Sequence, residues 1–295
     1  MSVYFSKVKQ KVSLIVIVSF SIWVNSLATL SPSPKFDPNG IFITTEYSTV
    51  LKARTDYMLS LMHIFLGIAG IDGNGQSELV EAIVGTLKPQ KGQVFLNGKD
   101  LSDYSVLKRQ EAGISHVSED RMRYGTAPKL SLEDNMISKI YYTDKLRSHG
   151  LIDRKKVNTY TNKILKEFLV KYDNSHQSVS ELSGGNVQKL VVGREFDYEP
   201  DLLIMNQPTR GIDVGAIEFI RRKIVEMRRE KKAILLVSAD LSEILSLSDA
   251  VLVMHEGRIV GYIDDVKHTS ENELGLYMLG VKEDSKEHIG GACCE

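Results

Sequence analysis

The chain has 295 residues, of which 42% are hydrophobic and 25% charged, so it can bury a globular core and is neither a disordered tail nor a fibre. Its 37 Lys and Arg and 38 Asp and Glu residues leave a formal charge of 37 − 38 = −1, which provides no overall basic field for nucleic acid or anionic lipid. The two cysteines, Cys293 and Cys294, are adjacent, which argues against a disulfide framework or a zinc site and fits a reducing compartment.

The N-terminal segment from Met1 to Ala28 differs from the rest of the chain. Lysines precede an apolar run, Val12 to Val24, which is short for a membrane-spanning helix of about 20 residues and is followed by small residues. This pattern is typical of a signal peptide. An anomalous N-terminal extension without a targeting role is the alternative. Residues 29–62 show no sustained periodicity and receive no assignment.

A glycine-rich stretch, GIDGNGQS, joins a short apolar run, Ile64 to Ala69, to a segment with helical spacing, Ser77 to Val84. Glycine backbones and a helix N-terminus can direct N–H groups at an anion, and strand–loop–helix is the context of a phosphate-binding loop. A tight turn without ligand accounts for one or two glycines but not for the serine at the helix start. We therefore predict a phosphate-binding loop formed by Gly70, Gly73, Asn74, Gly75, Gln76 and Ser77.

A helical region follows. Ser131 and Asp134 have the spacing of a capping box, and apolar residues line one face of a second helix expected from about Arg154 to Tyr172. The region ends at LSGGNVQ, residues 182–188, where a serine and two glycines precede another helix. This motif again presents backbone N–H groups at a helix start.

Strands and helices alternate through the rest of the chain. A buried strand, Leu202 to Met205, leads into NQPTRGID, and a helix with apolar residues from Ile217 to Met227 follows. Another buried strand, a helix and a hairpin complete the pattern. The alternation predicts an α/β fold with a parallel sheet, crossover helices and an inserted helical subdomain, with ligand at the carboxyl ends of the strands.

The order of these motifs closely resembles the ATP-binding subunits of ABC transporters over about residues 63–265. More narrowly, GIDGNGQSELVEAIVG, VSEDRMRYG at 117–125 and PTRGIDVGA at 208–216 resemble the second nucleotide-binding half of duplicated ATPases that import simple sugars or nucleosides. The resemblance implies a P-loop ATPase-like fold, with a nucleotide-binding domain at 63–265, a helical subdomain at about 126–182 and a polar tail at 266–295. It also favours the anomalous extension over the signal peptide, because export would separate the domain from ATP.

The sequence departs from an active half at four positions. Gln76 stands where the family has the phosphate-binding lysine, and Asn206 and Gln207 stand where it has the magnesium-associated aspartate and the catalytic glutamate. Ala239 replaces the switch histidine. The implied cofactors are ATP and Mg²⁺, with Ser77 as a candidate metal ligand. Since the catalytic positions are altered together, we expect this half to hydrolyse ATP poorly or not at all on its own.

The signature motif is intact. Ser183, Gly184, Gly185 and Asn186 match the family's signature, and Asp213 occupies the position of its D-loop aspartate. In this family the signature of one half closes on ATP held by the phosphate loop of the other. We therefore expect this chain to supply its signature in trans to a partner's active site.

The resemblance implies an ATP-binding half of an importer, peripheral on the cytoplasmic face of the cell membrane. Its expected partners are a second nucleotide-binding half, transmembrane permease subunits and, indirectly, a substrate-binding protein, with no role for nucleic acid. A non-hydrolytic nucleotide-binding regulator and a truncated, non-functional copy are the alternatives. We expect the isolated histidines His116, His255 and His268 to be exposed or hydrogen-bonded rather than ligands. The sequence specifies neither the solute, nor the direction of transport, nor an adenine-stacking residue.

Overall fold

The computed structural model describes residues 15–16, 42–44, 50–52, 65–89, 93–97, 99–285 and 288–289. The chain forms two compact units. The first unit comprises the residues up to Ile114 and those from Arg228 onward, and the second unit comprises Ser115–Met227. Among the described residues, every helix is too short or too polar to span a bilayer.

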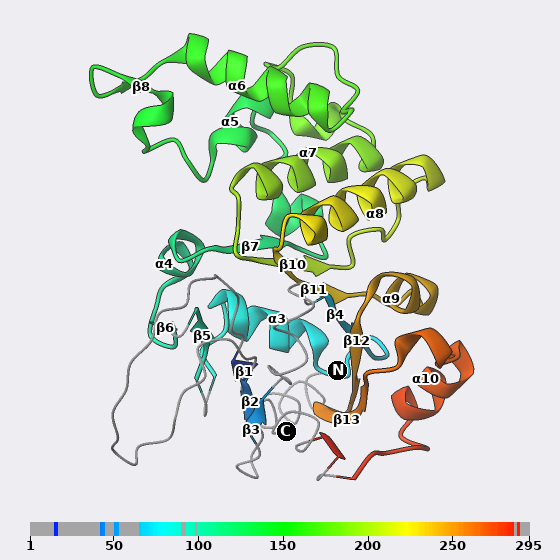
Figure 1. The fold of residues 1–295 in the computed structure, drawn as a ribbon. Coiled ribbons are helices and arrows are strands. Elements are labelled where there is room, and N and C mark those ends of the chain that lie inside the picture. Colours follow the sequence, from blue (N-terminus) through cyan, green and yellow to red (C-terminus); the bar gives the residue numbers. More distant parts are fainter. Residues whose placement is uncertain are drawn as a thin grey trace, which may run out of the picture. The chain divides into compact units, whose positions relative to one another are not determined.

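The first unit is built on four strands in the order β13-β12-β4-β11 (Figure 1). Strands β11 and β12 both run parallel to β4, and β12 and β13 form an antiparallel hairpin. The near-continuous apolar sequences of β4 and β11 suit strands that are buried along their whole length. Their bounds are β4 (Phe65–Ala69), β11 (Ala233–Val237), β12 (Ala250–His255) and β13 (Arg258–Ile263).

The first unit also contains short helices between and after its strands. Arg109 holds the end of the first of them, α3: its buried guanidinium donates from Nη1 to the carbonyls of Ala82 (2.6 Å) and Ile83 (2.8 Å). A cation here both satisfies terminal carbonyls and suits the negative end of the helix. The elements are α3 (Gln76–Val84), α4 (Val106–Glu111), α9 (Leu241–Leu247), η4 (Val266–His268) and α10 (Glu271–Met278), with a small hairpin of β5 (Phe95–Leu96) and β6 (Lys99–Asp100).

The second unit is mainly helical. Its strands β7 and β10 are neighbours, and β8 and β9 form a small antiparallel pair. Two elements, β7 and α8, run across the unit boundaries. The bounds are β7 (Ile114–Val117), η1 (Arg121–Gly125), α5 (Leu132–Ile137), η2 (Asp144–Leu146), β8 (Arg147–Ser148), β9 (Leu151–Ile152), α6 (Arg154–Glu167), η3 (Val179–Glu181), α7 (Gly184–Asp197), β10 (Leu202–Asn206) and α8 (Val214–Arg229).

Helix α6 is shorter than the sequence predicts. It ends at Glu167, with Phe168 as its C-cap, and Leu169 adopts a positive φ of 50° that no helix can continue. The apolar periodicity carries on past this point because Phe168 packs edge-to-face against Phe196 and Phe219 from two other helices. The helical spacing at Phe168 therefore reflects burial of a residue beyond the helix, whereas Leu169 is exposed, and the expected end at Tyr172 was wrong.

The polar stretch that begins at residue 266 contributes to the core of the first unit. Leu274 and Tyr277 of α10 pack in one buried cluster with Ile244 and Val251. The expected domain limits at 63–265, about 126–182 and 266–295 stay predictions. The predicted N-terminal segments, 1–28 and 29–62, lie outside the described residues except for an antiparallel sheet of β1 (Ile15–Val16), β2 (Phe42–Thr44) and β3 (Val50–Lys52).

Candidate functional site

The predicted site residues fall into two groups. The glycine-rich loop and Ala239 belong to the first unit, and residues 183–186, Asn206, Gln207 and Asp213 belong to the second. The loop joins the end of β4 to α3, with Gly73 at φ 90° and Gly75 at φ 107°. Only glycine adopts these values without strain. The N-cap residue of α3 is Gly75, which has no side chain to cap the helix, and first-turn N–H groups at such a helix start can stabilise an anion.

Gln76 folds back over this loop. Its Nε2 atom donates to the Ile71 carbonyl at 3.3 Å, and the side chain is only 7% exposed. A Cβ atom at Gly70 would lie 1.8 Å from that nitrogen, so a side chain at residue 70 would displace the amide. The structure thus brings Gly70 and Gln76 together as the sequence predicts, but with a neutral amide where a lysine would add a positive charge.

Asn74 anchors the loop to the rest of the first unit. Its Nδ2 donates to the carbonyls of Met254 (3.2 Å) and Met278 (3.4 Å), and its Oδ1 accepts from the Glu256 N–H (3.2 Å). The Asn74 N–H donates to the Ile71 carbonyl at 3.0 Å. The side chain of Asn74 is therefore directed into the fold, and its role in the loop is structural support.

The candidate Mg²⁺ ligand, Ser77, is neutral and provides an exposed hydroxyl in the first turn of α3. Asn206, at the position where the family has the magnesium-associated aspartate, ends β10 and is buried. Mg²⁺ is usually held by one or two carboxylates together with substrate phosphates and water. Among the described residues, no group of three or more His, Cys, Asp or Glu side chains could hold a metal ion. This donor set does not fit a resident Mg²⁺ site.

Gln207 has an unusual backbone. It follows β10 directly and adopts φ 52°, a left-handed conformation that costs a non-glycine residue on the order of 1 kcal/mol. The next residue is fixed by α7, because Gln188 Nε2 donates to the Pro208 carbonyl at 2.8 Å. The backbone of Gln207 is therefore strained, as is common in functional loops, although the side-chain amide of Gln207 cannot serve as a general base.

The signature residues meet Asp213 at the start of α7. Ser183 is the exposed N-cap residue, and its Oγ accepts from Asn186 Nδ2 at 2.9 Å. A Cβ atom at Gly185 would lie 2.6 Å from Asp213 Oδ2, while Asp213 Oδ1 accepts from the Ala216 N–H at 2.9 Å. The Asp213 carboxylate therefore caps α8 through Oδ1 and lies against the signature through Oδ2, and it fits there because Gly185 has no Cβ atom. The structure brings all the predicted signature residues and Asp213 together.

Ala239 brings no polar group to the edge of the first sheet. It follows β11 and is exposed. The residues around it do form a polar turn: Ser238 Oγ donates to Glu243 Oε2 at 2.7 Å, and Asp240 caps α9. Since β11 and β4 are parallel, with Val237 opposite Ile68, Ala239 and the glycine-rich loop lie at the same edge of the sheet. A histidine at 239 would place an imidazole there, and alanine does not.

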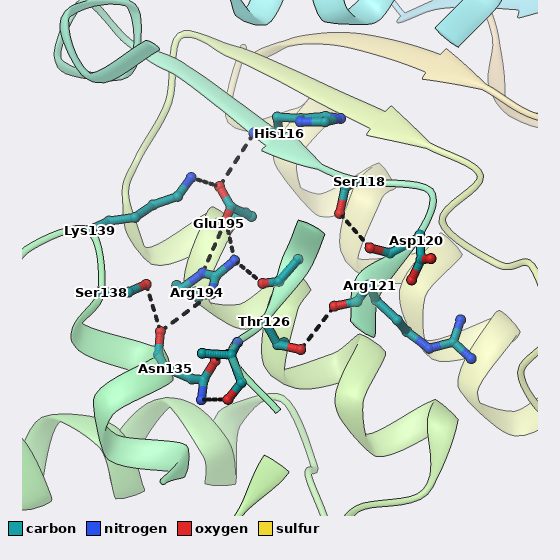
Figure 2. Close-up of polar contacts among 12 residues, drawn as sticks. His116, Ser118, Asp120, Arg121, Thr126, Asn135, Ser138, Lys139, Arg194 and Glu195 are labelled. Carbon is teal, nitrogen blue, oxygen red and sulfur yellow. Dashed lines mark hydrogen bonds and ion pairs between the residues drawn. The ribbon is translucent and has the colours of Figure 1, made fainter. Parts of the chain in front are cut away.

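A buried ionic cluster supports the helix that carries the signature (Figure 2). Glu195, which is fully buried near the end of α7, forms ion pairs with Lys139 and Arg194 and accepts from the His116 N–H at 3.3 Å. Arg194 also donates to the carbonyls of Gly125 (2.7 Å) and Asn135 (3.4 Å). The cluster therefore connects α7 to β7, to the turn η1 and to the end of α5.

Burial and charge shift the titration of this cluster. Burial would by itself raise the pKa of Glu195, but the cations Lys139 and Arg194 hold this pKa below its usual range. Burial lowers the pKa of His116 to about 4. The Nε2 atom of His116 is sealed from solvent and has no hydrogen-bond partner in the described structure, so the expectation of an exposed or satisfied ring was wrong for it. His255 and His268 do have polar contacts, with the Met278 carbonyl and Asp265 respectively.

We expect His116 to make the protein less stable in mild acid. The His116 imidazole takes up a proton near pH 6.5 in the unfolded chain but only near pH 4 in the folded chain. The contribution of neutral His116 to the free energy of unfolding is therefore fully present above pH 6.5 and is lost as the pH falls toward 4. The loss reaches about 3 kcal/mol, from 1.36 kcal/mol per pKa unit. Urea unfolding at pH 5 and 7 measures it. His116→Phe should remove most of the pH dependence between 5 and 6.5, where carboxylates contribute little, and an unchanged dependence would contradict the assignment.

Comparison with known proteins identifies the family. The ABC transporter family matches residues 63–210, half of the chain, so the chain belongs to this family. The nucleoside import ATP-binding protein NupA of Lactococcus lactis subsp. cremoris is 42% identical over 215 residues, which are 73% of this chain and 42% of that protein. The guanosine import ATP-binding protein NupO of Bacillus subtilis has the same identity over 215 residues and the same coverage. The chain thus spans about two fifths of the length of these relatives.

Solved structures confirm the predicted fold class. A dimeric bacterial ABC transporter cassette superposes with a TM-score of 0.61 at 17% identity, covering 76% of this chain and 91% of that one. A dimeric cassette in a post-hydrolysis state bound to ADP and phosphate gives a TM-score of 0.60 at 16% identity, covering 85% and 97%. At these identities the likeness shows the fold alone, which is the α/β fold of a P-loop ATPase.

Several supporting residues are absent from the sequence prediction. Arg121 lies against Gly184 of the signature, Gln188 donates to the Pro208 carbonyl, and Glu195, further along α7, pairs with Arg194 and Lys139. Each of these contacts exists only in the folded structure. The signal that marks Glu195 is weak but present, because an acidic residue in the apolar part of a helix has to be paired when it is buried. Arg121 lies in the VSEDRMRYG stretch, whose likeness to the family drew attention without indicating a role.

Proposed function

We propose that this chain is the ATP-binding half of an ABC importer for simple sugars or nucleosides, and that it completes a partner's ATP site while its own site is hydrolytically degenerate. The substrate class rests on relatives that are named for nucleoside, guanosine and ribose import. The partners are a second cassette with a lysine-containing loop and permease subunits, and through them a substrate-binding protein. The place of action is the cytoplasmic face of the membrane.

The observation that supports this proposal is that Gly185 and Asp213 pack together at the signature, whereas neutral residues occupy positions 76, 206, 207 and 239. Gly185 and Asp213 fit together at the exposed N-terminus of α7, where helix N–H groups favour a phosphate. The chain's own loop lacks the cation that would contact the β- and γ-phosphates, a contact worth about 1.5–3 kcal/mol. Gln207 lacks general-base chemistry, which is worth about 10²–10⁴-fold in rate.

This chain would still bind ATP through the backbone of its glycine-rich loop. When bound, ATP would bring its own phosphate charge and a leaving group for phosphoryl transfer. Gly73, Gly75 and the first turn of α3 would hold the phosphates through backbone N–H groups, and Asn74 would keep the loop in shape. These groups bind and orient, but none of them accepts a proton from water. The residues of this half therefore support nucleotide binding without turnover.

We expect the purified chain to bind ATP weakly and to show almost no ATP hydrolysis. The measurement is phosphate release at saturating ATP with Mg²⁺, with Gly75→Asp as the control for contaminating activity, because this change blocks the loop. Turnover of about 1 s⁻¹ or more that Gly75→Asp abolishes would show an active site and contradict the proposal. Tight ATP binding without any partner cassette would favour a nucleotide-binding regulator instead.

A further inference from the structure

Three segments that are far apart in the sequence meet beside the N-terminus of α7. Arg121, the first residue of η1, donates from Nη1 to the Arg210 carbonyl (3.0 Å) and from Nη2 to the Gly211 carbonyl (3.2 Å). Residues 210 and 211 lead directly into Asp213. A single guanidinium thus binds two successive carbonyls of the loop that carries the D-loop aspartate through two different nitrogens, Nη1 and Nη2, whereas a lysine has only one nitrogen.

The same guanidinium lies over the signature. A Cβ atom at Gly184 would lie 2.8 Å from Arg121 Nη2, just as one at Gly185 would lie 2.6 Å from Asp213 Oδ2. Each of the two signature glycines therefore makes room for a particular side chain, Arg121 in the first case and Asp213 in the second. The glycines serve the packing of this loop as well as exposing backbone N–H groups.

Arg121 is itself held in place. Asp120 accepts from the N–H groups of Met122 (3.1 Å) and Arg123 (3.0 Å), which fixes the start of η1, and Thr126 Oγ1 donates to the Arg121 carbonyl at 2.9 Å. Figure 2 shows the Arg121 side chain extending away from the ionic cluster of Glu195. The Arg210 side chain in turn forms an ion pair with Glu119, two residues before Arg121. The segment 119–121 and the loop 210–211 therefore bind each other reciprocally.

We propose that Arg121 is a positioning residue of the composite ATP site: it holds the loop 210–213 against Gly184, so that Ser183 and Asp213 are presented together to a partner's nucleotide. This inference rests on the proposed function for its consequence in catalysis, although the contacts themselves exist in the chain alone. Arg121 acts through the backbone carbonyls and has no role in proton transfer.

The first test uses the isolated 295-residue chain. In Arg121→Ala, the amides at 184–187 and 211–213 should exchange with deuterium on the order of tenfold faster, because the loop loses its two hydrogen bonds. The matched control is Arg123→Ala, two residues further along the same turn, whose side chain lies over the Tyr124 ring at 5.1 Å. Its exchange should match the unaltered chain. Equal exchange in Arg121→Ala and Arg123→Ala would overturn the inference.

A double-mutant comparison tests the contact with the signature glycine. Gly184→Ala should speed exchange at 211–213 in the unaltered background, because the new methyl group displaces the guanidinium. In the Arg121→Ala background the same substitution should have little further effect, since its clash partner is gone. Additive effects of the two substitutions would show that Gly184 and Arg121 act independently, and would overturn the proposed contact.

The second test uses the complex with a lysine-containing cassette. Arg121→Ala should lower kcat on the order of tenfold and change the KM for ATP less than about threefold, because the phosphate-binding loop belongs to the partner. Arg121→Lys should recover little of the loss. A change in KM alone, or no change in kcat, would overturn the positioning role. Ser183→Arg, assayed in parallel, separates the two claims: if it is silent, the proposed function fails, and the exchange data still decide the role of Arg121.

Discussion

Ser183→Arg and Gly185→Asp should each reduce ATP hydrolysis by the complex of this chain with the proposed partner cassette by at least about a hundredfold. Both changes act at the N-terminus of α7, where the phosphate held by the partner's loop should lie. Arginine adds bulk at the exposed Ser183, and aspartate adds a negative charge where the backbone presents N–H groups. A hundredfold loss corresponds to about 2.7 kcal/mol of transition-state stabilisation.

Gln207→Ala is the matched control for these two changes. It removes an amide from a site that already lacks a base, so hydrolysis should fall less than about tenfold, or about 1.4 kcal/mol. Gly185→Asp also places two carboxylates together, because its Cβ would lie 2.6 Å from Asp213 Oδ2, and thermal unfolding should therefore accompany its assay. Ser183→Arg avoids that clash. A reversed ranking, in which Ser183→Arg is silent and Gln207→Ala abolishes turnover, would contradict the asymmetric site.

Glu195→Ala should lower the free energy of unfolding by about 3–5 kcal/mol. The substitution would leave Lys139 and Arg194 as buried cations without their counter-ion, and the cost of an uncompensated buried charge is of this size. It also removes the acceptor of the His116 N–H. Because Glu195 lies on the same helix as the signature, loss of the cluster should loosen α7 as well as destabilise the unit.

Urea unfolding at pH 7 measures this effect. Glu218→Ala is the matched control, because Glu218 is an exposed acidic residue on α8 and its loss should change stability by less than about 0.5 kcal/mol. Glu195→Gln, which keeps the size and one acceptor but not the charge, should fall between the two. A loss below about 1 kcal/mol for Glu195→Ala would mean that the cations find solvent or other acceptors.

The sequence was sufficient for those features that depend on local pattern. The loop from Gly70 to Ser77 could be predicted because closely spaced glycines between a buried run and a helical run are typical of a phosphate-binding turn, and the start of α7 followed from LSGG in the same way. The alternation of elements likewise predicted the α/β class. In each case the residues that carry the signal are neighbours along the chain.

The features that the sequence did not reveal depend on contacts over long separations. Arg121 and Gly211 are 90 residues apart, and Asn74 reaches the Met278 carbonyl across 204 residues. Gly184 illustrates the difference: its presence in the motif was plain, but the reason for it, the guanidinium of Arg121, exists only in the folded chain. The end of α6 was missed because Phe168 keeps the helical spacing while packing as part of a loop.

The altered residues also bear on whether the chain is a decaying copy. Random loss would degrade the supporting structure along with the catalytic positions. In this chain Gln188 fixes Pro208, Asn74 holds the glycine loop and Asp213 caps α8. Under the proposed function, these contacts would hold the signature in place although the four hydrolytic positions are altered.

The most direct measurement counts the nucleotides trapped by orthovanadate in the assembled complex. With ATP as the only nucleotide added, vanadate takes the place of the released phosphate and traps the ADP that hydrolysis has formed. We expect one ADP for each pair of cassettes, located on the partner's lysine-containing loop and lost when Ser183 of this chain is replaced by arginine. Two trapped ADP molecules for each pair, or one that persists in Ser183→Arg, would contradict the asymmetric site.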